Sequence, residues 1–234
     1  MNKNRDIMVV IPTYNNPKTI KKVLDDVLTH NFQVIIVDDG SDTKVEDLIE
    51  NKNITVLRHE KNRGKGQAIL TGAKKAKELG YDFFISMDGD GQHLASEIFK
   101  LVDAKNSQNQ IVIGSRNFNI ENVPTISKVG RAFHNFWIKL NSGYDIKDSL
   151  TGFRLYPTSI LNLNIKCKRF NFEAEVLVKH YWKYKNITDT TIECYYPTPE
   201  ERVSHFDNYK DTISITLLHL KLFTQKIFLL KGLF

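Results

Sequence analysis

Short apolar runs alternate with longer amphipathic runs in the first half of the chain. The short runs are rich in β-branched residues and apolar on both faces, which is typical of buried strands. They cover residues 6–12, 33–41, 54–58, 81–87 and 110–116. Runs with helical spacing lie between them, over 13–30, around 45–49 and over 64–80. Buried strands separated by helices predict an α/β fold with a mostly parallel, twisted sheet and helices on both faces.

Local signals mark the expected helix ends. Asn16 is expected to cap the first helix, with Pro17 in its first turn, and Gly80 is expected to follow the end of the helix over 64–80. The apolar stripes of the two helices predict which residues face the sheet. These are Ile20, Val23, Leu24, Val27 and Leu28 in the first helix, and Ala68, Ile69, Ala73 and Ala76 in the second.

The pattern changes after residue 120. Residues 127–140 and 172–184 have helical patterns, 147–157 indicates a turn into a strand, and 186–197 alternates like an exposed strand. This region has no core long enough to fold alone. We therefore expect one domain over residues 1–206, in which the later region completes the fold and forms the second half of a cleft.

The C-terminal segment 207–234 contains a strongly apolar stretch, residues 211–234, that is interrupted by His219, Lys221, Lys226 and Lys231. One interpretation is an amphipathic helix packed on the domain. The other is a helix lying in the surface of an anionic membrane, with Lys221, Lys226 and Lys231 reaching the headgroups. No run reaches the ~18 uninterrupted apolar residues of a spanning helix, and the N-terminal apolar run is too short for a signal peptide. We expect a cytoplasmic chain, peripheral at the inner face of the cell membrane.

The composition adds two constraints. A formal net charge of +6 suggests anionic partners, which include phosphates, nucleic acid and an acidic membrane surface. The only two cysteines, Cys167 and Cys194, are far apart in the sequence and in no metal-like spacing. They are expected to be free thiols in a reducing cytosol rather than a disulfide framework.

The strongest candidate for chemistry is the pair Asp88 and Asp90, which follows a buried strand with Gly89 between the two acids. Residues two apart in an extended chain point the same way, so both carboxylates can face one ion. Mg²⁺ and Mn²⁺ prefer such oxygen ligands, and Gln92 offers another oxygen. The alternative is a turn with solvated acids, since Asp-Gly pairs are common in turns. The position at the carboxyl end of a central strand favours a metal, because ligands of such sheets bind there.

Three further features are open to two interpretations each. Asp39 could bond a base or ribose edge, while Ser41 or Asp42 could cap a helix. The glycines of NRGKGQA (62–68) could present backbone N–H groups to a phosphate or be purely structural, because the spacing is not that of a Walker loop. A group of arginines could hold phosphates or form surface salt bridges. These are Arg116, Arg131, Arg154 and Arg202.

Seven blocks of the chain carry a family resemblance. In order and approximate spacing they resemble the family-2 glycosyltransferases with the GT-A fold, and the nearest branch is the dolichol-phosphate mannosyltransferase-like one, which transfers sugars to dolichyl or polyprenyl phosphates. The resemblance covers residues 7 to 206. The blocks are VVIPTYNN, VIIVDDGSD, NRGKGQA, MDGDGQH, IVIGSR, DSLTGFRLY and FEAEVLVK.

The resemblance implies a role for each matching residue. The nucleotide-sugar donor, linked to GDP or UDP, would be held by Pro12, Tyr14, Asn16, Val37, Asp39, Met87 and Asp88. Asp90 and Gln92 would bind Mg²⁺ or Mn²⁺. Arg116, Arg131 and Arg202 would face the acceptor phosphate or the diphosphate. Asp148 would lie near the reacting sugar, which makes Asp88, Asp90 and Asp148 the catalytic candidates.

The chain departs from the family at two positions. The family usually has glutamate where this chain has Asn16, and it often has lysine where this chain has His205. A lid carrying His205 in place of lysine would be less strongly charged when it closes on the diphosphate.

The resemblance implies a single displacement at the anomeric carbon with inversion, in which a metal at Asp90 offsets the charge growing on the leaving diphosphate. A lipid-phosphate acceptor is already an anion and needs no base. A hydroxyl acceptor on a glycan, glycolipid or cell-wall polymer would need one, for which Asp148 and Glu173 are candidates. A nucleotidyltransferase is disfavoured because no glycine-rich basic loop follows the first strand. A nucleic-acid binder is disfavoured because the clustered acids would repel a polyanion, so no nucleic-acid partner is expected.

Overall fold

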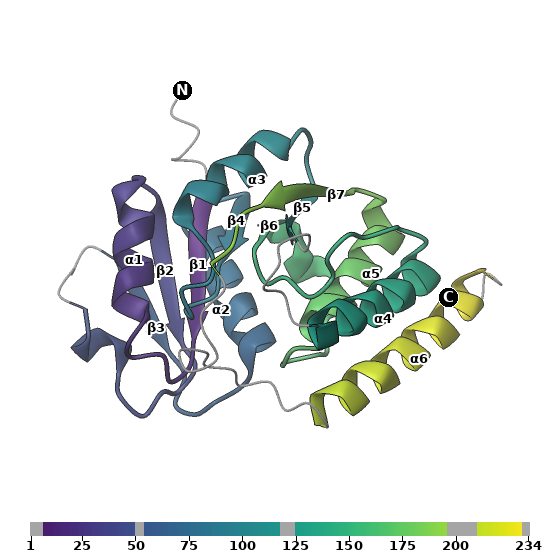
Figure 1. Cartoon of the computed structure of the whole chain (residues 1–234), viewed down its shortest axis with the longest axis horizontal. Helices are drawn as coiled ribbons and strands as arrows, with labels where there is room; N and C mark the ends of the chain where they lie inside the picture. Colours follow the sequence, from purple (N-terminus) through teal and green to yellow (C-terminus); the bar gives the residue numbers. More distant parts are fainter. Residues whose placement is uncertain (1–6, 50–53, 118–124, 196–209, 231–234) are drawn as a thin grey trace.

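The structure is a computed structural model that describes residues 7–49, 54–117, 125–195 and 210–230. One sheet of seven strands runs through its centre, in the order β3-β2-β1-β4-β6-β5-β7 (Figure 1). The strands are β1 (Ile7–Thr13), β2 (Gln33–Asp38), β3 (Thr55–Arg58), β4 (Phe83–Ser86), β5 (Ile111–Arg116), β6 (Arg154–Pro157) and β7 (Ile187–Ile192).

Helices cover both faces of the sheet. They are α1 (Ile20–Thr29), α2 (Lys65–Glu78), α3 (Ile98–Ala104), α4 (Thr125–Ser142), α5 (Phe172–Tyr184) and α6 (Lys210–Leu230), with short 3₁₀ helices at Val45–Asp47, Ala95–Glu97 and Thr158–Asn162. Alternate residues of β1 enter opposite cores, because successive strand side chains point to opposite faces. Val9 and Ile11 pack with α1 and α3, whereas Met8 and Val10 pack with the helices of the other face. The predicted α/β fold with helices on both faces is confirmed.

Most of the predicted elements are present. The residues predicted to be buried in α1 and α2 are buried except Leu28, which is half-buried. Gly80 follows the end of α2 with a positive φ of 87°, and its N–H donates to Lys77 O. The start of α1 was predicted wrongly, since the helix begins at Ile20 and Thr19 stands at its N-cap. Asn15 has a left-handed φ of 52°, which keeps this stretch out of the helix.

The later half of the chain joins the same sheet. Strand β6 lies between β4 and β5 and is antiparallel to both, while the pairs β1–β2, β2–β3, β1–β4 and β5–β7 are parallel. The sheet is therefore mixed, as "mostly parallel" allows, but β5 does not pair with β4. Because two antiparallel pairings restore the direction, the carboxyl ends of β1, β2, β4 and β5 still meet at one edge.

Helix α6 packs on α4 and α5 through one face and exposes the other (Figure 1). Ile215, Leu218, His219 and Leu222 are buried at this contact. The ring of His219 stacks on Trp137 of α4, with centroids 5.7 Å apart. The first interpretation of the C-terminal stretch, a helix packed on the domain, is confirmed for the inner face of α6. The predicted boundary at residue 206 lies outside the described residues.

No helix among the described residues combines the length and the apolar character needed to cross a membrane.

Candidate functional site

The acidic residues predicted at strand ends do lie at the carboxyl edge of the sheet, but two of them serve the loops around them. Asp38 accepts hydrogen bonds from Ser41 N and Val45 N and pairs with Arg58. Burial alone would raise the pKa of Asp38, but the bonds from Ser41 hold it below its usual range. The prediction that Ser41 or Asp42 caps a helix is wrong, because the 3₁₀ helix has Lys44 at its N-cap and no side-chain cap bond.

Asp39 holds the loop that leads into α2. Its Oδ1 accepts from Arg63 N at 2.9 Å and lies 2.6 Å from His59 Nδ1, and its Oδ2 accepts from Gly64 N at 2.8 Å. Gly64 has φ 95°, a conformation that favours glycine. Gly64 therefore has a structural role, because its N–H is already donated to Asp39. A nucleotide contact from Asp39 stays a prediction, and it would have to share a carboxylate that is already bonded on both oxygens.

A pocket of about 250 Å³ opens between the ends of β1 and β2. The loops after these strands are joined across it, because Asn15 N donates to Ser41 Oγ and Asn15 Nδ2 donates to Asp42 Oδ2. Asn16 lines the same pocket, and Ile20 is among its apolar lining residues. Polar groups around a small concave site suit one flat polar ring, such as a nucleobase.

The predicted nucleotide residues differ in how accessible they are. Pro12 and Val37 are register partners in β1 and β2 and are buried, as is Met87 after β4. Tyr14 and Asn16 are half-buried at the same edge. A ligand at this edge would therefore contact the loop residues first.

Asp88 is held by a lysine. Lys65, the first residue of α2, places its Nζ 2.8 Å from Asp88 Oδ1 and 3.0 Å from Glu173 Oε1 in the first turn of α5. Burial would raise the pKa of Asp88, but the Lys65 ammonium keeps it below its usual range. Burial would lower the pKa of Lys65, and the two carboxylates raise it instead. Asp88 and Lys65 thus form an ion pair at the carboxyl end of β4.

Asp90 lacks such a partner among the described residues. Its oxygens accept from Gln92, through the backbone N–H and through Nε2, each at 3.0 Å. Burial, together with the charge of Asp88, raises the pKa of Asp90 to about 6. The turn itself is fixed from α1, because Thr19 Oγ1 donates to Gly89 O at 2.6 Å. A half-buried carboxylate with no cation paired to it among the described residues is suited to an added one.

The predicted metal ligands fit Mg²⁺ or Mn²⁺. Asp90 supplies carboxylate oxygens, and a half-turn of the Gln92 amide would present its oxygen beside them. No group of three or more acidic, histidine or cysteine side chains with metal geometry occurs in the described ranges. A hard cation held by few protein ligands takes its remaining oxygens from water and substrate phosphates, as Mg²⁺ usually does.

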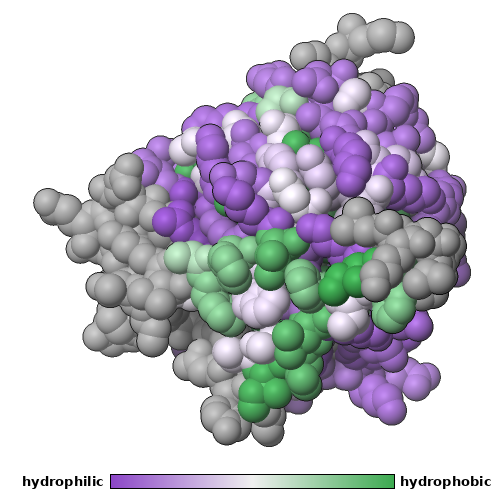
Figure 2. All heavy atoms as spheres, turned by 90° about the vertical axis from the view of Figure 1, so that its right-hand side faces the viewer, coloured by the Kyte–Doolittle hydropathy of each residue, from purple (hydrophilic) through white to green (hydrophobic). Residues whose placement is uncertain are grey.

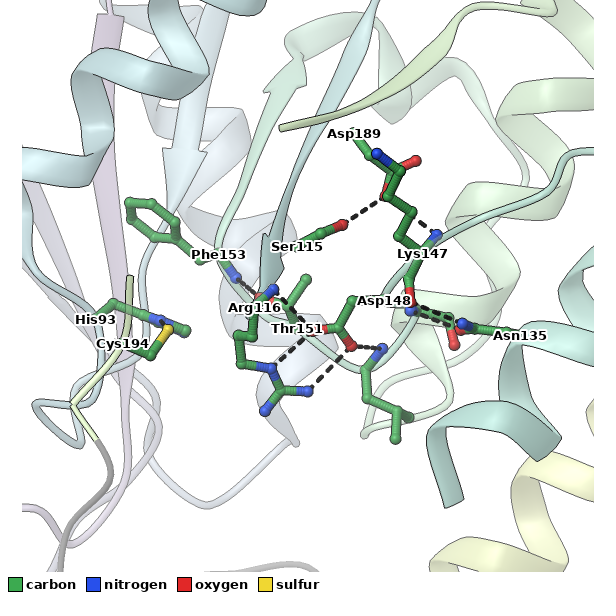
Figure 3. A network of polar contacts seen from close by, with 12 residues as sticks. His93, Ser115, Arg116, Asn135, Lys147, Asp148, Thr151, Phe153, Asp189 and Cys194 are labelled. Atoms are coloured by element: carbon green, nitrogen blue, oxygen red, sulfur yellow. Dashed lines mark hydrogen bonds and ion pairs between the residues drawn. The ribbon is translucent and has the colours of Figure 1, made fainter. Parts of the chain in front are cut away.

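His93 backs the same turn from the core. Its ring stacks on Phe153, with centroids 5.0 Å apart, and its Nδ1 lies 3.8 Å from the sulfur of Cys194 (Figure 3). Its Nε2 faces Asp88 Oδ2 at 3.8 Å. Burial lowers the pKa of His93 to about 4, so the ring is neutral. The imidazole therefore packs behind Asp88 without supplying a charge.

Arg116 and Asp148 point toward each other at the end of β5 (Figure 3). Arg116 Nε donates to Asp148 Oδ2 at 2.7 Å and Nη2 donates to Oδ1 at 3.1 Å, while Asp148 has no exposed surface. In this structure Asp148 therefore fixes the position of the Arg116 guanidinium. Arg131 lies half-buried on α4, and Arg202 and His205 lie outside the described residues.

Arg154 was misjudged from the sequence as a phosphate-binding candidate. It is completely buried, and its guanidinium donates to Tyr156 Oη, Glu173 O and Ser149 O. Its charge is used to join β6 to α5 rather than to meet a ligand.

The residue that sequence reasoning missed is Lys65. A lysine at the first position of a helix opposes the helix dipole, which favours anions there. That mismatch, between two glycines, was a signal that acidic side chains from elsewhere compensate it. The sequence could not say which acids, because Asp88 and Glu173 belong to distant segments.

The outer face of α6 carries exposed apolar side chains, and α4 adds Phe133 and Phe136. Figure 2 shows an apolar patch on this side of the molecule, bordered by hydrophilic surface. Leu217 is 62% exposed and Phe136 59%. The other exposed members on α6 are Ile213, Leu220, Ile227 and Phe228. We call these residues, with Phe133, Phe136 and Leu217, the apolar patch.

The chain is similar to known glycosyltransferases in sequence and in fold. The family described as Glycosyl transferase family 2 matches residues 8–163. A UDP-N-acetylglucosamine--dolichyl-phosphate N-acetylglucosaminyltransferase of Methanococcus voltae is 33% identical over 215 residues, covering 81% of this chain and 86% of the relative. A dolichol-phosphate mannosyltransferase of Pyrococcus furiosus is 31% identical over 203 residues, covering 78% of this chain but 54% of the relative.

Solved structures give a likeness of fold. A glucosyl-3-phosphoglycerate synthase of Mycobacterium tuberculosis, in complex with Mn²⁺, UDP and phosphoglyceric acid, has a TM-score of 0.70 to this structure at 16% identity. The match covers 95% of this chain and 78% of that one. At this identity the likeness concerns the architecture alone.

Proposed function

The chain belongs to glycosyltransferase family 2, and we propose that it transfers a sugar from a GDP- or UDP-linked donor to the phosphate of a dolichyl- or polyprenyl-type lipid, with inversion. Two relatives at 31–33% identity are named for transfer to dolichyl phosphate. The observation that carries the proposal is the pair at the end of β4, in which Asp88 is neutralised by Lys65 and Asp90 is not.

The donor would lie along the carboxyl edge of the sheet. Its base would occupy the pocket beside Asn15 and Asp42, and its diphosphate would lie toward Asp88 and Asp90. Asp90 and Gln92 would hold Mg²⁺ or Mn²⁺. A divalent cation there supplies positive charge to the departing diphosphate.

The surroundings of the two side chains that could act as a base favour one class of acceptor. Asp148 is buried and bonded to Arg116, and Glu173 is buried and paired with Lys65. Neither is placed to take a proton from a hydroxyl. A lipid phosphate is an anion at neutral pH and needs no proton removal. Because both acids are already paired with a cation, a lipid-phosphate acceptor is favoured over a hydroxyl acceptor. Arg116, 21% exposed beside the edge, would add positive charge for that phosphate.

The lipid tail would be met at the apolar patch. An amphipathic helix that buries one face in the protein and exposes Leu217 and Phe228 on the other suits the interface of a membrane. Lys221 lies exposed on the same helix, where a lysine can reach anionic headgroups. We propose peripheral attachment at the cytoplasmic face, with no nucleic-acid partner.

A direct test incubates the full chain with radiolabelled GDP- and UDP-sugars, polyprenyl phosphate and Mn²⁺ or Mg²⁺. We expect an acid-labile, lipid-soluble product from one donor, and no product with EDTA or with Asp90→Ala. An acid-stable glycoside formed on a hydroxyl acceptor would contradict the lipid-phosphate acceptor and support the alternative, a hydroxyl acceptor. Full activity in EDTA would contradict the role of Asp90.

A further inference from the structure

Lys65 is placed by four segments at once. It begins α2, its Nζ touches Asp88 after β4 and Glu173 in α5, and Gly152 of the loop before β6 closes over the contact. A Cβ at Gly152 would lie 2.6 Å from Lys65 Nζ and 2.5 Å from Asp88 Oδ2, so a larger residue would displace the charged ends of both side chains. The Lys65 side chain is 19% exposed, so the ammonium borders the open edge.

Glu173 is the second carboxylate that holds the lysine. Its Oε1 takes the ion pair, while its Oε2 is buried without a hydrogen-bond partner among the described residues. A buried carboxylate with one unsatisfied oxygen costs stability. The ion pair with Lys65 offsets part of this cost.

The lysine pairs with one of the two aspartates. Its Nζ lies 2.8 Å from Asp88 Oδ1, whereas the Asp90 oxygens accept hydrogen bonds from Gln92. The Lys65 ammonium forms an ion pair with Asp88 and forms none with Asp90. The negative charge of Asp88 is therefore offset by a protein side chain, whereas that of Asp90 is left to attract a metal ion.

We propose that Lys65, anchored by Glu173, is a positioning residue that assigns the two aspartates different tasks. It holds Asp88 as a fixed anion at the donor and weakens its pull on the cation, so that the cation stays with Asp90. This inference rests on the proposed function, because it presumes a donor diphosphate and a divalent cation at this edge.

The proposal predicts an inverted effect on metal binding. Without the Lys65 charge, Asp88 and Asp90 together present a more negative site, so Lys65→Met should bind Mn²⁺ about fivefold to tenfold more tightly, the effect of removing one nearby charge from a half-buried site. Sugar transfer should nevertheless fall about 100-fold, because Asp88 is no longer held in place. Glu173→Gln should act oppositely on Mn²⁺, weakening its binding about threefold, since the lysine charge is then less compensated.

Mn²⁺ binding is measured by electron paramagnetic resonance on the full chain, with and without UDP or GDP, so that no turnover is needed. Lys77→Met, an exposed lysine on the same helix, is the matched control and should leave both measurements unchanged. Circular dichroism establishes that each variant is folded. A purely structural role for Lys65 would weaken Mn²⁺ binding in both variants, and that outcome, or unchanged binding in Lys65→Met, overturns the proposal.

The two proposals can fail separately. Opposite shifts in Mn²⁺ affinity without any transfer to polyprenyl phosphate would support the division between the aspartates and contradict the acceptor. Transfer to polyprenyl phosphate, with Mn²⁺ affinity shifted in the same direction in both variants, would support the acceptor and contradict the division between the aspartates.

Discussion

The carboxyl edge of the sheet and the layer formed by α4 and α6 are built on opposite principles. At the edge, charged side chains form ion pairs, such as Lys65 with Asp88 and Arg116 with Asp148. In the helical layer, large apolar side chains such as Leu217 and Phe136 stand in solvent. The first arrangement holds each charge against a partner at hydrogen-bond distance, and a reaction at one carbon needs such positioning. The second suits a partner without fixed atomic positions, as a lipid surface is.

The largest expected effect on sugar transfer comes from adding a methyl group at the edge, compared with adding one in the helical layer. Gly152→Ala drives a Cβ into Asp88 and Lys65, so sugar transfer should fall about 100-fold while the chain stays folded. Gly130→Ala on α4 meets nothing within 4 Å, and it should leave transfer unchanged while raising the free energy of unfolding by roughly 0.5–1 kcal/mol. Initial rates and urea unfolding measure the two effects. Equal rates in both variants would mean that the edge tolerates misplacement as well as the helical layer does.

A smaller effect is expected from a charge placed on the apolar patch. Leu217→Glu should reduce flotation with vesicles of phosphatidylcholine and phosphatidylglycerol about tenfold, because one leucine no longer enters the apolar region. Leu79→Glu, on a leucine that is 48% exposed at the end of α2, is the control and should float as the unchanged chain does. Equal losses in both variants would point to net charge rather than to the patch.

The smallest effect concerns how α6 is attached. Burial, with a lesser contribution from the charge of His134, lowers the pKa of His219 from 6.5 to about 4. Protonation therefore favours the undocked helix, so docking is at full strength above pH 6.5 and weakens as the pH falls from 6.5 toward 4.

Fluorescence of Trp137 reports this change, since its ring stacks on His219. In a Trp182→Phe background, emission should shift to longer wavelength as the pH falls through this range. His219→Phe keeps a ring in the stack and should abolish the shift. A shift that persists in His219→Phe would assign the acid effect to another group.

The same two regions differ in how far the sequence predicts them. Strands β1, β2 and β4 were predicted because β-branched runs report burial locally, and Asp88 and Asp90 because strand ends at this edge bind ligands. The start of α1 was missed because the loop before it is set by distant contacts, such as that of Asn15 with Ser41. The pairing of Lys65 with Glu173 was missed for the same reason, since no local pattern encodes a contact between two helices.

The helical layer shows the limit in another form. The amphipathic character of residues 207–234 left two interpretations open, a helix packed on the domain and a helix lying in a membrane surface, and it did not indicate which residues would be buried. His219 reads as a polar interruption in the sequence, yet it is fully buried against Trp137 and Asn141. Burial of a polar ring depends on partners supplied by α4, which periodicity cannot identify.

The insertion of β6 between β4 and β5 has a consequence for biosynthesis. Strand β5 leaves the ribosome well before Arg154–Pro157, the segment that connects it to the sheet. Until that segment is translated, β4 presents an unpaired edge and β5 has no neighbour in the sheet, a state in which nascent chains are prone to misassociate. Synthesis of this enzyme therefore includes an interval when its sheet is open at the centre, and a chaperone bound during that interval would protect the nascent chain.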